Sequence, residues 1–490
     1  MKVLLIGMDG CHQEVFQRGW TPHITMLHET RKQMDIQNDL LSRGWLEISL
    51  GEHATVTSAL YDKPKSNRSL DWKTEFSILD VSDAENVKPL WTRLNEAGYS
   101  VGIMNVPTSF PAPHVNGFFV SGGGGGAPVT EDATRELIYP PEILHVLHEH
   151  GYIVDNRLYE LVVDKQLETP AKIFERLQHK NERRTNTFVA LNKKYDVDFG
   201  FIVFKTASVL AETFLTTEYV RRKNMLNTGD ESLINAIRDY YQNFDAQVKK
   251  LTDLYPDAEI IFVSDHGTTQ RTHTVNPNIL LQQNGFQKVT HGKSIVKGAI
   301  SKFKEIVPFW LKAYLKKSSL SKVKDVGQIN FNTETSRAFC KTQGDWTHGI
   351  YINDQARFGG PVAQAEIENI KEQIVTLINS DPTAQQHGIK AIPTAKVDGA
   401  VLTYFPDIQV CVPNGYLTSD KGKSFVSEFV APLSKSSLAS IMKGDILSIK
   451  SHSPIASIST KMAAKFTADE LSGDLTVVYD RVIDMMSLKS

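Results

Sequence analysis

The stretch AEIIFVSDHGTTQ, residues 258–270, decides the fold prediction. Its four apolar residues, Ile260 to Val263, are followed after one serine by the polar pair Asp265 and His266. A short apolar run that ends in polar residues and glycine is typical of a strand buried on both faces of a parallel sheet. We therefore expect an acid and an imidazole at the carboxyl end of a buried strand. Open α/β sheets bind their ligands at that edge.

Other segments have the same character. Buried strands are predicted in KVLLIGMDG (2–10), GYSVGIMNV (98–106) and DFGFIVFK (198–205). Residues 231–255 repeat apolar side chains at helical spacing before the strand at 258–265. A strand, a long helix and a strand in succession predict a right-handed crossover between parallel strands. The predicted fold class is therefore α/β, with a mainly parallel, doubly wound sheet and helices on both faces.

Two segments interrupt this rhythm. Residues 123–195 begin in a glycine run and continue as charged, helical sequence, for which we expect a cap or insert. Residues 293–326 form a predicted basic helical insert, a pair of amphipathic helices broken at Pro308. We interpret it as a solvated helical insert whose apolar side packs on the core. The alternative is a face that binds a membrane surface or an anionic substrate. The predicted core takes the rest of the chain: residues 1–122, 196–292 and 327–490.

Composition describes an ordinary globular protein. The 490 residues are 41% apolar and 22% charged with a net charge of −2, so a sizeable core is expected and a nucleic-acid polymer is not an expected partner. The three cysteines show neither metal-site nor disulfide spacing. No apolar run reaches the roughly 18 residues of a membrane helix, and the N-terminus lacks a signal-peptide pattern. We expect a cytoplasmic protein without a transmembrane segment. The oligomeric state stays open.

Asp9 follows its apolar run as Asp265 and His266 follow theirs. If both strands end at one edge, these side chains can ligate one ion, because carboxylate oxygen and imidazole nitrogen bind zinc, manganese or iron. The alternative is that Asp9 caps a turn and His266 is an ordinary core histidine. Ser49 precedes a segment predicted to be helical, and a hydroxyl at a helix N-terminus lies where amide groups favour anions. Ser49 could equally be a simple N-cap.

Taken in order, these segments resemble the alkaline phosphatase superfamily, specifically its type I phosphodiesterase/nucleotide pyrophosphatase branch. VLLIGMDG is similar to that family's first metal-binding strand, and VSDHG (263–267) to its Asp-His metal motif. SLGEHATVTSALY (49–61) resembles its nucleophile segment. NVPTSFPAPHVNGFFVSG (105–122) and GIYIND (349–354) resemble segments of the predicted phosphohydrolase/phosphomutase subgroup. The ordered series, more than any one motif, carries the resemblance.

The resemblance implies an alkaline phosphatase-like core and a metal-dependent phosphoester hydrolase acting on a small-molecule phosphate ester. Asp9, Asp265 and His266 would hold a divalent metal, which we take to be zinc, with manganese or magnesium as alternatives. Ser49 would bind the same metal and act as the nucleophile through a covalent phospho-enzyme-type intermediate.

The sequence departs from the family at its second metal site. That site uses an Asp-x-x-x-His pair, and the matching residues here are Ala207 and Ala211, neither of which can bind a metal. His452 is the candidate for the site's late histidine. Glu212 or His348 are alternatives that could complete the site, so one or two metals per chain stay open.

A protein cation could replace the missing charge of a second ion. Lys205, which ends a predicted strand, and Arg43 are the candidates, although a lysine at a strand end is more often a solvated charge. His53, four residues after Ser49, could bind substrate or complete the second metal site.

Two other functions stay open. A family member could bind a phosphorylated metabolite without turnover, which the alanines at the second metal site motivate, or it could transfer phosphate to an acceptor alcohol. A sulfatase is disfavoured because SLGEH lacks the Pro and Arg of the sulfatase motif. The run SGGGGGA (121–127) lacks the ending of a phosphate-binding P-loop.

Overall fold

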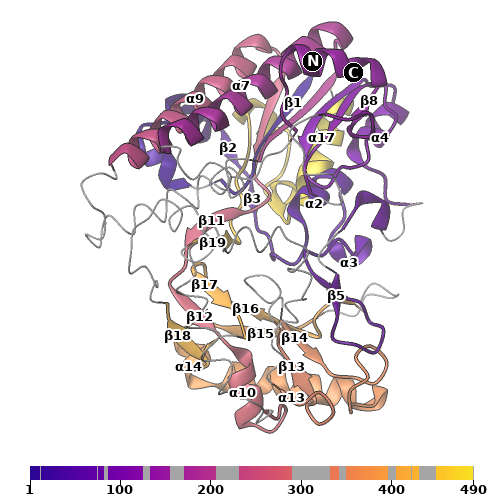
Figure 1. Ribbon diagram of the computed structural model, residues 1–490, viewed down its shortest axis with the longest axis vertical. Coiled ribbons are helices and arrows are strands. Elements are labelled where there is room, and N and C mark those ends of the chain that lie inside the picture. The colour runs from indigo at the N-terminus through magenta and orange to yellow at the C-terminus, as the bar shows by residue number, and fades with distance from the viewer. Residues whose placement is uncertain are drawn as a thin grey trace.

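A computed structural model shows how the chain folds (Figure 1). The structure describes twelve stretches of the chain: residues 1–11, 13–73, 76–81, 86–124, 133–154, 170–205, 231–289, 331–341, 349–394, 404–420, 422–429 and 448–488. The predicted insert at 293–326 lies outside these residues. Ala207, Ala211, Glu212 and His348 also lie outside them.

The larger domain is built on a sheet with parallel strands at its centre. Its described strands run in the order β2-β20-β10-β1-β9-β6-β7-β8. The five central strands, β10, β1, β9, β6 and β7, are parallel to one another. At the edges, β2, β20 and β8 pair antiparallel with their neighbours. The predicted α/β class with a mainly parallel sheet is confirmed. The strands are β1 Val3–Met8, β2 Lys32–Gln33, β6 Val101–Val106, β7 Gly117–Ser121, β8 Ile138–Tyr139, β9 Phe199–Phe204, β10 Glu259–Val263 and β20 Ala456–Ile458.

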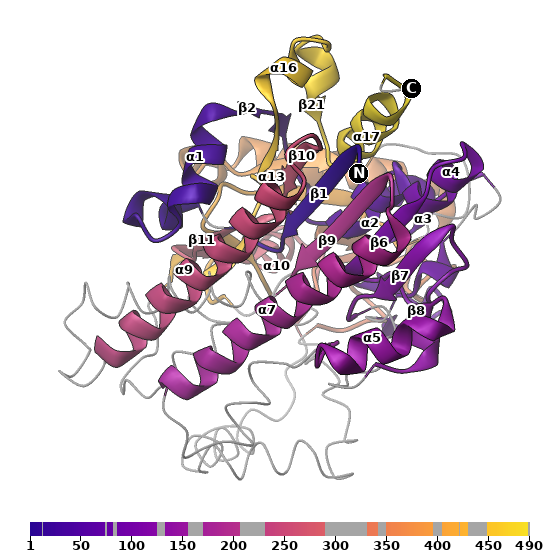
Figure 2. The same cartoon turned by 90° about the horizontal axis from the view of Figure 1, so that it is seen from above.

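Helices cover both faces of this sheet because both faces are apolar. Leu4 and Ile6 of β1 pack in one buried cluster, and Val3 and Leu5 in another, as the two-residue period of a strand requires. Helices α1, α5, α7 and α9 contribute to the first cluster, and α2, α4, α16 and α17 to the second (Figure 2). None of the described helices is long and apolar enough to cross a membrane. Their bounds are α1 Pro22–Thr30, α2 Gly44–Leu50, α4 Leu90–Glu96, α5 Leu144–Glu149, α7 Pro170–Tyr195, α9 Glu231–Leu254, α16 Thr460–Ala463 and α17 Thr476–Leu488.

A smaller domain lies below the sheet in Figure 1 and has its own apolar core, to which Ile350, Ile374 and Ile408 belong. Strand β11, Gly267–Gln270, leads towards it, and β19, Ser448–Ser451, pairs antiparallel with β11 on the way back. The chain therefore leaves and re-enters the larger domain beside the end of β10. The small domain contains β12 His273–Val275, β13 Ala338–Phe339, β14 Gly349–Ile352, β15 Lys390–Pro393, β16 Ile408–Cys411, β17 Tyr416–Thr418, β18 Val426–Glu428, α10 Pro277–Gln283, α13 Ile367–Ser380 and α14 Pro382–Gln386.

The described residues divide differently from the predicted domains. We expected a separate cap at 123–195, but β8 from this segment pairs with β7, and Phe174 and Leu191 of α7 fill the first core cluster. We assigned 327–490 to the core, but its described residues from 331 to 428 belong mainly to the smaller domain. Both differences have one cause. An amphipathic pattern shows that an element has a buried face, not which elements it packs against.

Candidate metal centre

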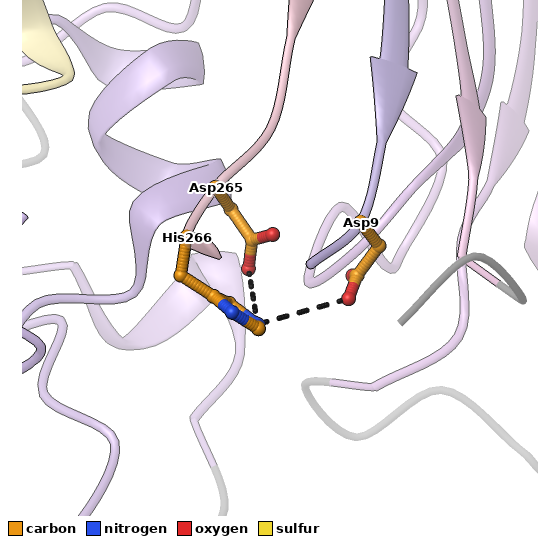
Figure 3. A group of neighbouring side chains, drawn as sticks. All are labelled: Asp9, Asp265 and His266. Atoms are coloured by element: carbon orange, nitrogen blue, oxygen red, sulfur yellow. Dashed lines mark ion pairs between the residues drawn. The ribbon is translucent and has the colours of Figure 1, made fainter. Parts of the chain in front are cut away.

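Asp9, Asp265 and His266 meet at the carboxyl edge of the sheet (Figure 3). Asp9 follows β1, and the other two follow β10, its parallel neighbour. His266 Nε2 lies 3.8 Å from Asp9 Oδ1 and 3.6 Å from Asp265 Oδ2, and one donor atom from each residue lies within 4.8 Å of the others. Donors around a tetrahedral zinc ion at about 2.1 Å lie roughly 3.4 Å apart. The three side chains, called the trio below, fit a metal ion after small adjustments.

Hydrogen bonds turn one donor atom of each trio residue towards the others. The His266 ring Nδ1 lies 2.7 Å from the Gly267 carbonyl and donates to it, so Nε2 keeps its lone pair for a ligand. The indole Nε1–H of Trp45 donates to Asp9 Oδ2 over 2.9 Å. The backbone N–H of Gly10 donates to Asp265 Oδ1 over 3.3 Å. Asp9 Oδ1, Asp265 Oδ2 and His266 Nε2 therefore face one another.

Two glycines let helix α2 pack directly on the strand ends. A Cβ atom on Gly44, the first residue of α2, would lie 2.4 Å from the Asp265 carbonyl oxygen. A Cβ atom on Gly7 of β1 would lie 2.6 Å from the Trp45 ring. Any larger residue at either position would push the helix away. The close approach is what places the Trp45 indole beside Asp9.

Burial decides the charges of the trio. Only 8% of Asp9 and 3% each of Asp265 and His266 are exposed. Burial raises the pKa of both carboxyls, that of Asp265 to about 6, and it lowers the pKa of His266 to about 3. The imidazole is therefore neutral, as a metal ligand must be. Burial makes the ionised forms of Asp9 and Asp265 costly, and a cation between the two carboxylates would stabilise those forms.

Lys450 is the cation of this site that the sequence analysis missed. It lies on β19 directly opposite Thr268 of β11, two residues beyond His266. Its Nζ lies 3.8 Å from the centre of the Tyr61 ring, and its charge lowers the pKa of all three trio residues. One signal could have found it. Lys450 stands two residues before His452, a predicted site residue, and a lysine so close in sequence is a candidate for the same site.

Ser49 does not lie where we expected. Helix α2 runs from Gly44 to Leu50 and ends at Gly51 in the left-handed conformation, with φ of 68°, so Ser49 is in its last turn. The segment that follows forms only the short helix α3, Ala54–Thr57. Ser49 is fully buried, and its Oγ has no hydrogen-bond partner among the described residues. Ser49 lies five positions after Gly44, the first residue of the helix, which is about 7.5 Å along the axis. The prediction of a helix N-terminus at Ser49 is wrong.

The two predicted cations have different surroundings. Lys205 directly follows β9, and because Met8 pairs with Phe204, Lys205 and Asp9 leave neighbouring strands at the same edge. Arg43 precedes α2 and donates to the backbone carbonyls of Leu60 and Tyr61 over 2.9 and 3.1 Å. Lys205 therefore lies at the metal-site edge, while two N–H groups of Arg43 hold a backbone segment.

The two predicted histidines lie outside the trio. His53 caps α3, with its Nδ1 accepting from the Thr55 N–H over 3.1 Å and its Nε2 2.9 Å from Asp39 Oδ2. His452 Nδ1 lies 2.8 Å from the Asn38 carbonyl oxygen. Both line a cleft between the domains. The alanines at the second metal site lie outside the described residues, so that site stays a prediction.

Comparisons with known proteins find one family and several solved structures that are similar to this chain. The model of the type I phosphodiesterase / nucleotide pyrophosphatase family matches residues 3–332. Phosphonoacetate hydrolase from Sinorhizobium meliloti 1021, solved with phosphonoformate, is 11% identical, with a TM-score of 0.51 over 99% of this chain and 96% of that one. Murine ectonucleotide pyrophosphatase/phosphodiesterase 5 is 10% identical, with a TM-score of 0.41 over 99% and 95%. The alkaline phosphatase PafA is 12% identical, with a TM-score of 0.43 over 93% and 90%. No curated protein matches the chain in sequence.

Proposed function

The chain belongs to the type I phosphodiesterase / nucleotide pyrophosphatase family, and from that premise we propose that it is a metal-dependent phosphoester hydrolase. One observation carries the proposal. Asp9, Asp265 and His266 come from two parallel strands and bring three donor atoms within 4.8 Å of one another at the carboxyl edge of the sheet. That edge is where α/β sheets bind ligands.

The trio would hold one divalent ion, zinc in the first instance and manganese or magnesium as alternatives. Such an ion supplies two effects, polarisation of a phosphoryl oxygen and a lower pKa for an attacking hydroxyl or water. The chain's own residues would do the rest. Trp45 holds the Asp9 carboxylate in place, and Lys450 adds positive charge close to the trio. Positive charge aimed at the phosphoryl oxygens stabilises the transition state of phosphoryl transfer.

The proposal assigns the attack to water and leaves Ser49 out of the chemistry. A buried hydroxyl in the last turn of α2 would have to leave the core to reach a phosphoryl group. On this proposal the covalent intermediate that the resemblance implies does not form at Ser49. A Ser49→Ala variant separates the two mechanisms, because only the covalent mechanism needs the hydroxyl.

The test is hydrolysis of p-nitrophenyl phosphate and bis(p-nitrophenyl) phosphate by chelator-treated protein after addition of zinc, manganese or magnesium. We expect turnover to depend on the added metal and to fall at least about a hundredfold in Asp265→Asn. Asp35→Asn, at the exposed residue of the short strand Asp35–Ile36, is the matched control and should keep full activity. Equal rates in both variants and in the wild type would refute the proposed site.

A second candidate function is binding of a phosphorylated metabolite without turnover. The burial of Ser49 favours it, because the hydroxyl at the position that resembles the family's nucleophile is not exposed for attack on a bound ester. The same protein would then bind a phosphate ester in isothermal titration calorimetry while releasing no product. Binding together with metal-dependent product release would rule it out.

A further inference from the structure

A cleft of about 660 Å³ lies between the two domains, within the size range of small-molecule sites. One wall comes from the larger domain and includes Asp39, Glu47 and His53. The opposite wall is β16 of the smaller domain with the residues that follow it, including Val410 and Val412. The trio does not line this cleft, although His53 and His452, two of the histidines considered for the second metal site, do.

The cleft is acidic. Its described lining includes the carboxyl groups of Asp39, Glu47 and Asp474 and contains no lysine or arginine. His53 offsets part of this charge, because its Nε2 lies 2.9 Å from Asp39 Oδ2, and although burial lowers its pKa, the hydrogen bond and charge of Asp39 and the charge of Glu47 raise it on balance. One imidazole still faces three carboxyl groups. The cleft thus favours a cation over a neutral or anionic ligand.

Glu47 points to where that cation binds. Its side chain lines the cleft although only 2% of the residue is exposed, and its Oε2 finds no hydrogen-bond partner within the described residues. Its Oε1 lies 3.7 Å from His53 Nε2, beyond hydrogen-bond range. A buried carboxyl oxygen without a partner is costly, and a ligand that donates a hydrogen bond to it would remove that cost.

The donor set fits an organic ammonium group better than a metal ion. A divalent ion needs three or four donors converging on one point, and in the described chain only the trio brings three His, Cys, Asp or Glu donors within 4.8 Å. An ammonium group is satisfied by one charged acceptor and polar neighbours. The apolar side chains of Leu41, Val410 and Val412 also line the cleft. Such side chains cannot ligate a metal ion, but they can pack against an alkyl chain.

We propose that this cleft binds a small aliphatic amine, with the ammonium group on Glu47 and the alkyl chain along Leu41, Val410 and Val412. The site does not depend on hydrolysis at the trio. Its occupant bridges the two domains, because Glu47 belongs to α2 of the larger domain and Val410 to β16 of the smaller one.

The test is isothermal titration calorimetry of the full chain with n-butylamine and 1,4-diaminobutane, and with 1-butanol and butyrate as uncharged and anionic counterparts. It is run near pH 9, because the Glu47 carboxyl, whose pKa burial raises to about 8, is then ionised while the alkylammonium group keeps its proton. We expect the amines to bind at least about tenfold more tightly than the counterparts. Glu47→Gln keeps the shape and removes the charge, and should weaken amine binding at least about tenfold. Asp35→Asn, which removes a carboxylate outside the cleft, should bind like the wild type.

A second variant keeps the proposal testable if Glu47→Gln folds poorly. Val410→Arg leaves Glu47 intact and places a cation on the opposite wall, so it should also weaken amine binding at least about tenfold. Equal binding of butylamine and butanol, or unchanged amine affinity in either variant, would overturn the proposal. Stoichiometric displacement of the amine by zinc in Asp265→Asn protein would also overturn it, because the cleft would then be a metal site.

Discussion

The indole Nε1 of Trp45 lies 2.9 Å from Asp9 Oδ2 and donates a hydrogen bond to it. The bond joins the first turn of α2 to the end of β1, and it leaves Asp9 Oδ1 facing His266. Groups that hold a metal ligand in this way set its orientation and its basicity. The packing of one helix therefore controls the geometry of the trio.

Trp45→Phe should weaken metal binding about tenfold or more while the fold is kept, because the phenyl ring fills much of the same space but cannot donate to Asp9. Metal titration of chelator-treated protein measures the effect. Trp91→Phe is the matched control, since Trp91 is buried in the same apolar cluster and packs on Phe119. Equal metal affinity in the two variants would show that the Trp45–Asp9 hydrogen bond has no role in binding.

Lys450→Met should separate metal binding from catalysis. Removing a positive charge beside the trio should tighten metal binding, because cations repel. The same change should lower phosphoester hydrolysis about a hundredfold, since the charge that stabilises the phosphoryl oxygens is lost. Lys450→Arg should recover part of the activity, and Lys461→Met on the exposed side of α16 should change neither quantity. Parallel loss of both quantities would argue for a merely structural role of Lys450.

Ser49→Ala should leave kcat/KM within about twofold of the wild-type value. It should also leave the free energy of unfolding unchanged or raise it by about 1 kcal/mol, because it removes a buried hydroxyl that has no partner in the described chain. Steady-state kinetics and urea denaturation test the two expectations. A loss of activity of about a hundredfold or more in folded protein would restore Ser49 as the nucleophile.

Glu47 should make the stability of the protein depend on pH. Burial, with the nearby charge of Asp39 second, raises the pKa of its carboxyl from 4.5 to about 8, and Asp474 acts in the same direction while His53 opposes it. Between these two values the folded state keeps a proton that the unfolded state releases, so stability falls as pH rises through this window.

Glu47→Gln cannot lose a proton, so this contribution to the pH dependence should disappear. The quantity to compare is the free energy of unfolding of the variant minus that of the wild type. This difference should be up to about 5 kcal/mol larger near pH 8 than below pH 4.5. Urea denaturation of both proteins across this range measures the difference. A difference that stays constant with pH would contradict the raised pKa of Glu47.

The parts of the site that local sequence determines could be predicted. The apolar runs before Asp9 and before Asp265 and His266 fix two buried strands, and parallel pairing puts their carboxyl ends at one edge. The meeting of these side chains in the trio is confirmed. The identity of the metal, the number of ions and the cytoplasmic location stay predictions, and the oligomeric state stays open.

The rest depended on long-range packing. Both GWLEISL and EHATVTSALY can form helices, and the left-handed turn at Gly51 assigns the longer helix to the first, which puts Ser49 at its end. Lys450 reaches the trio only because β19 pairs with β11, about 180 residues earlier in the chain. No local pattern encodes that pairing, and none showed that α7 would join the larger domain.

The central claim is that the trio binds a metal ion, and the most direct measurement is the metal content per chain by elemental mass spectrometry. Protein purified without chelator or metal-binding tag would be compared with Asp265→Asn and with the control Asp35→Asn. The account predicts at least one divalent ion per chain in the wild type and the control, and one ion fewer in Asp265→Asn. No bound metal after addition of zinc, manganese or magnesium, or equal metal content in all three proteins, would contradict it.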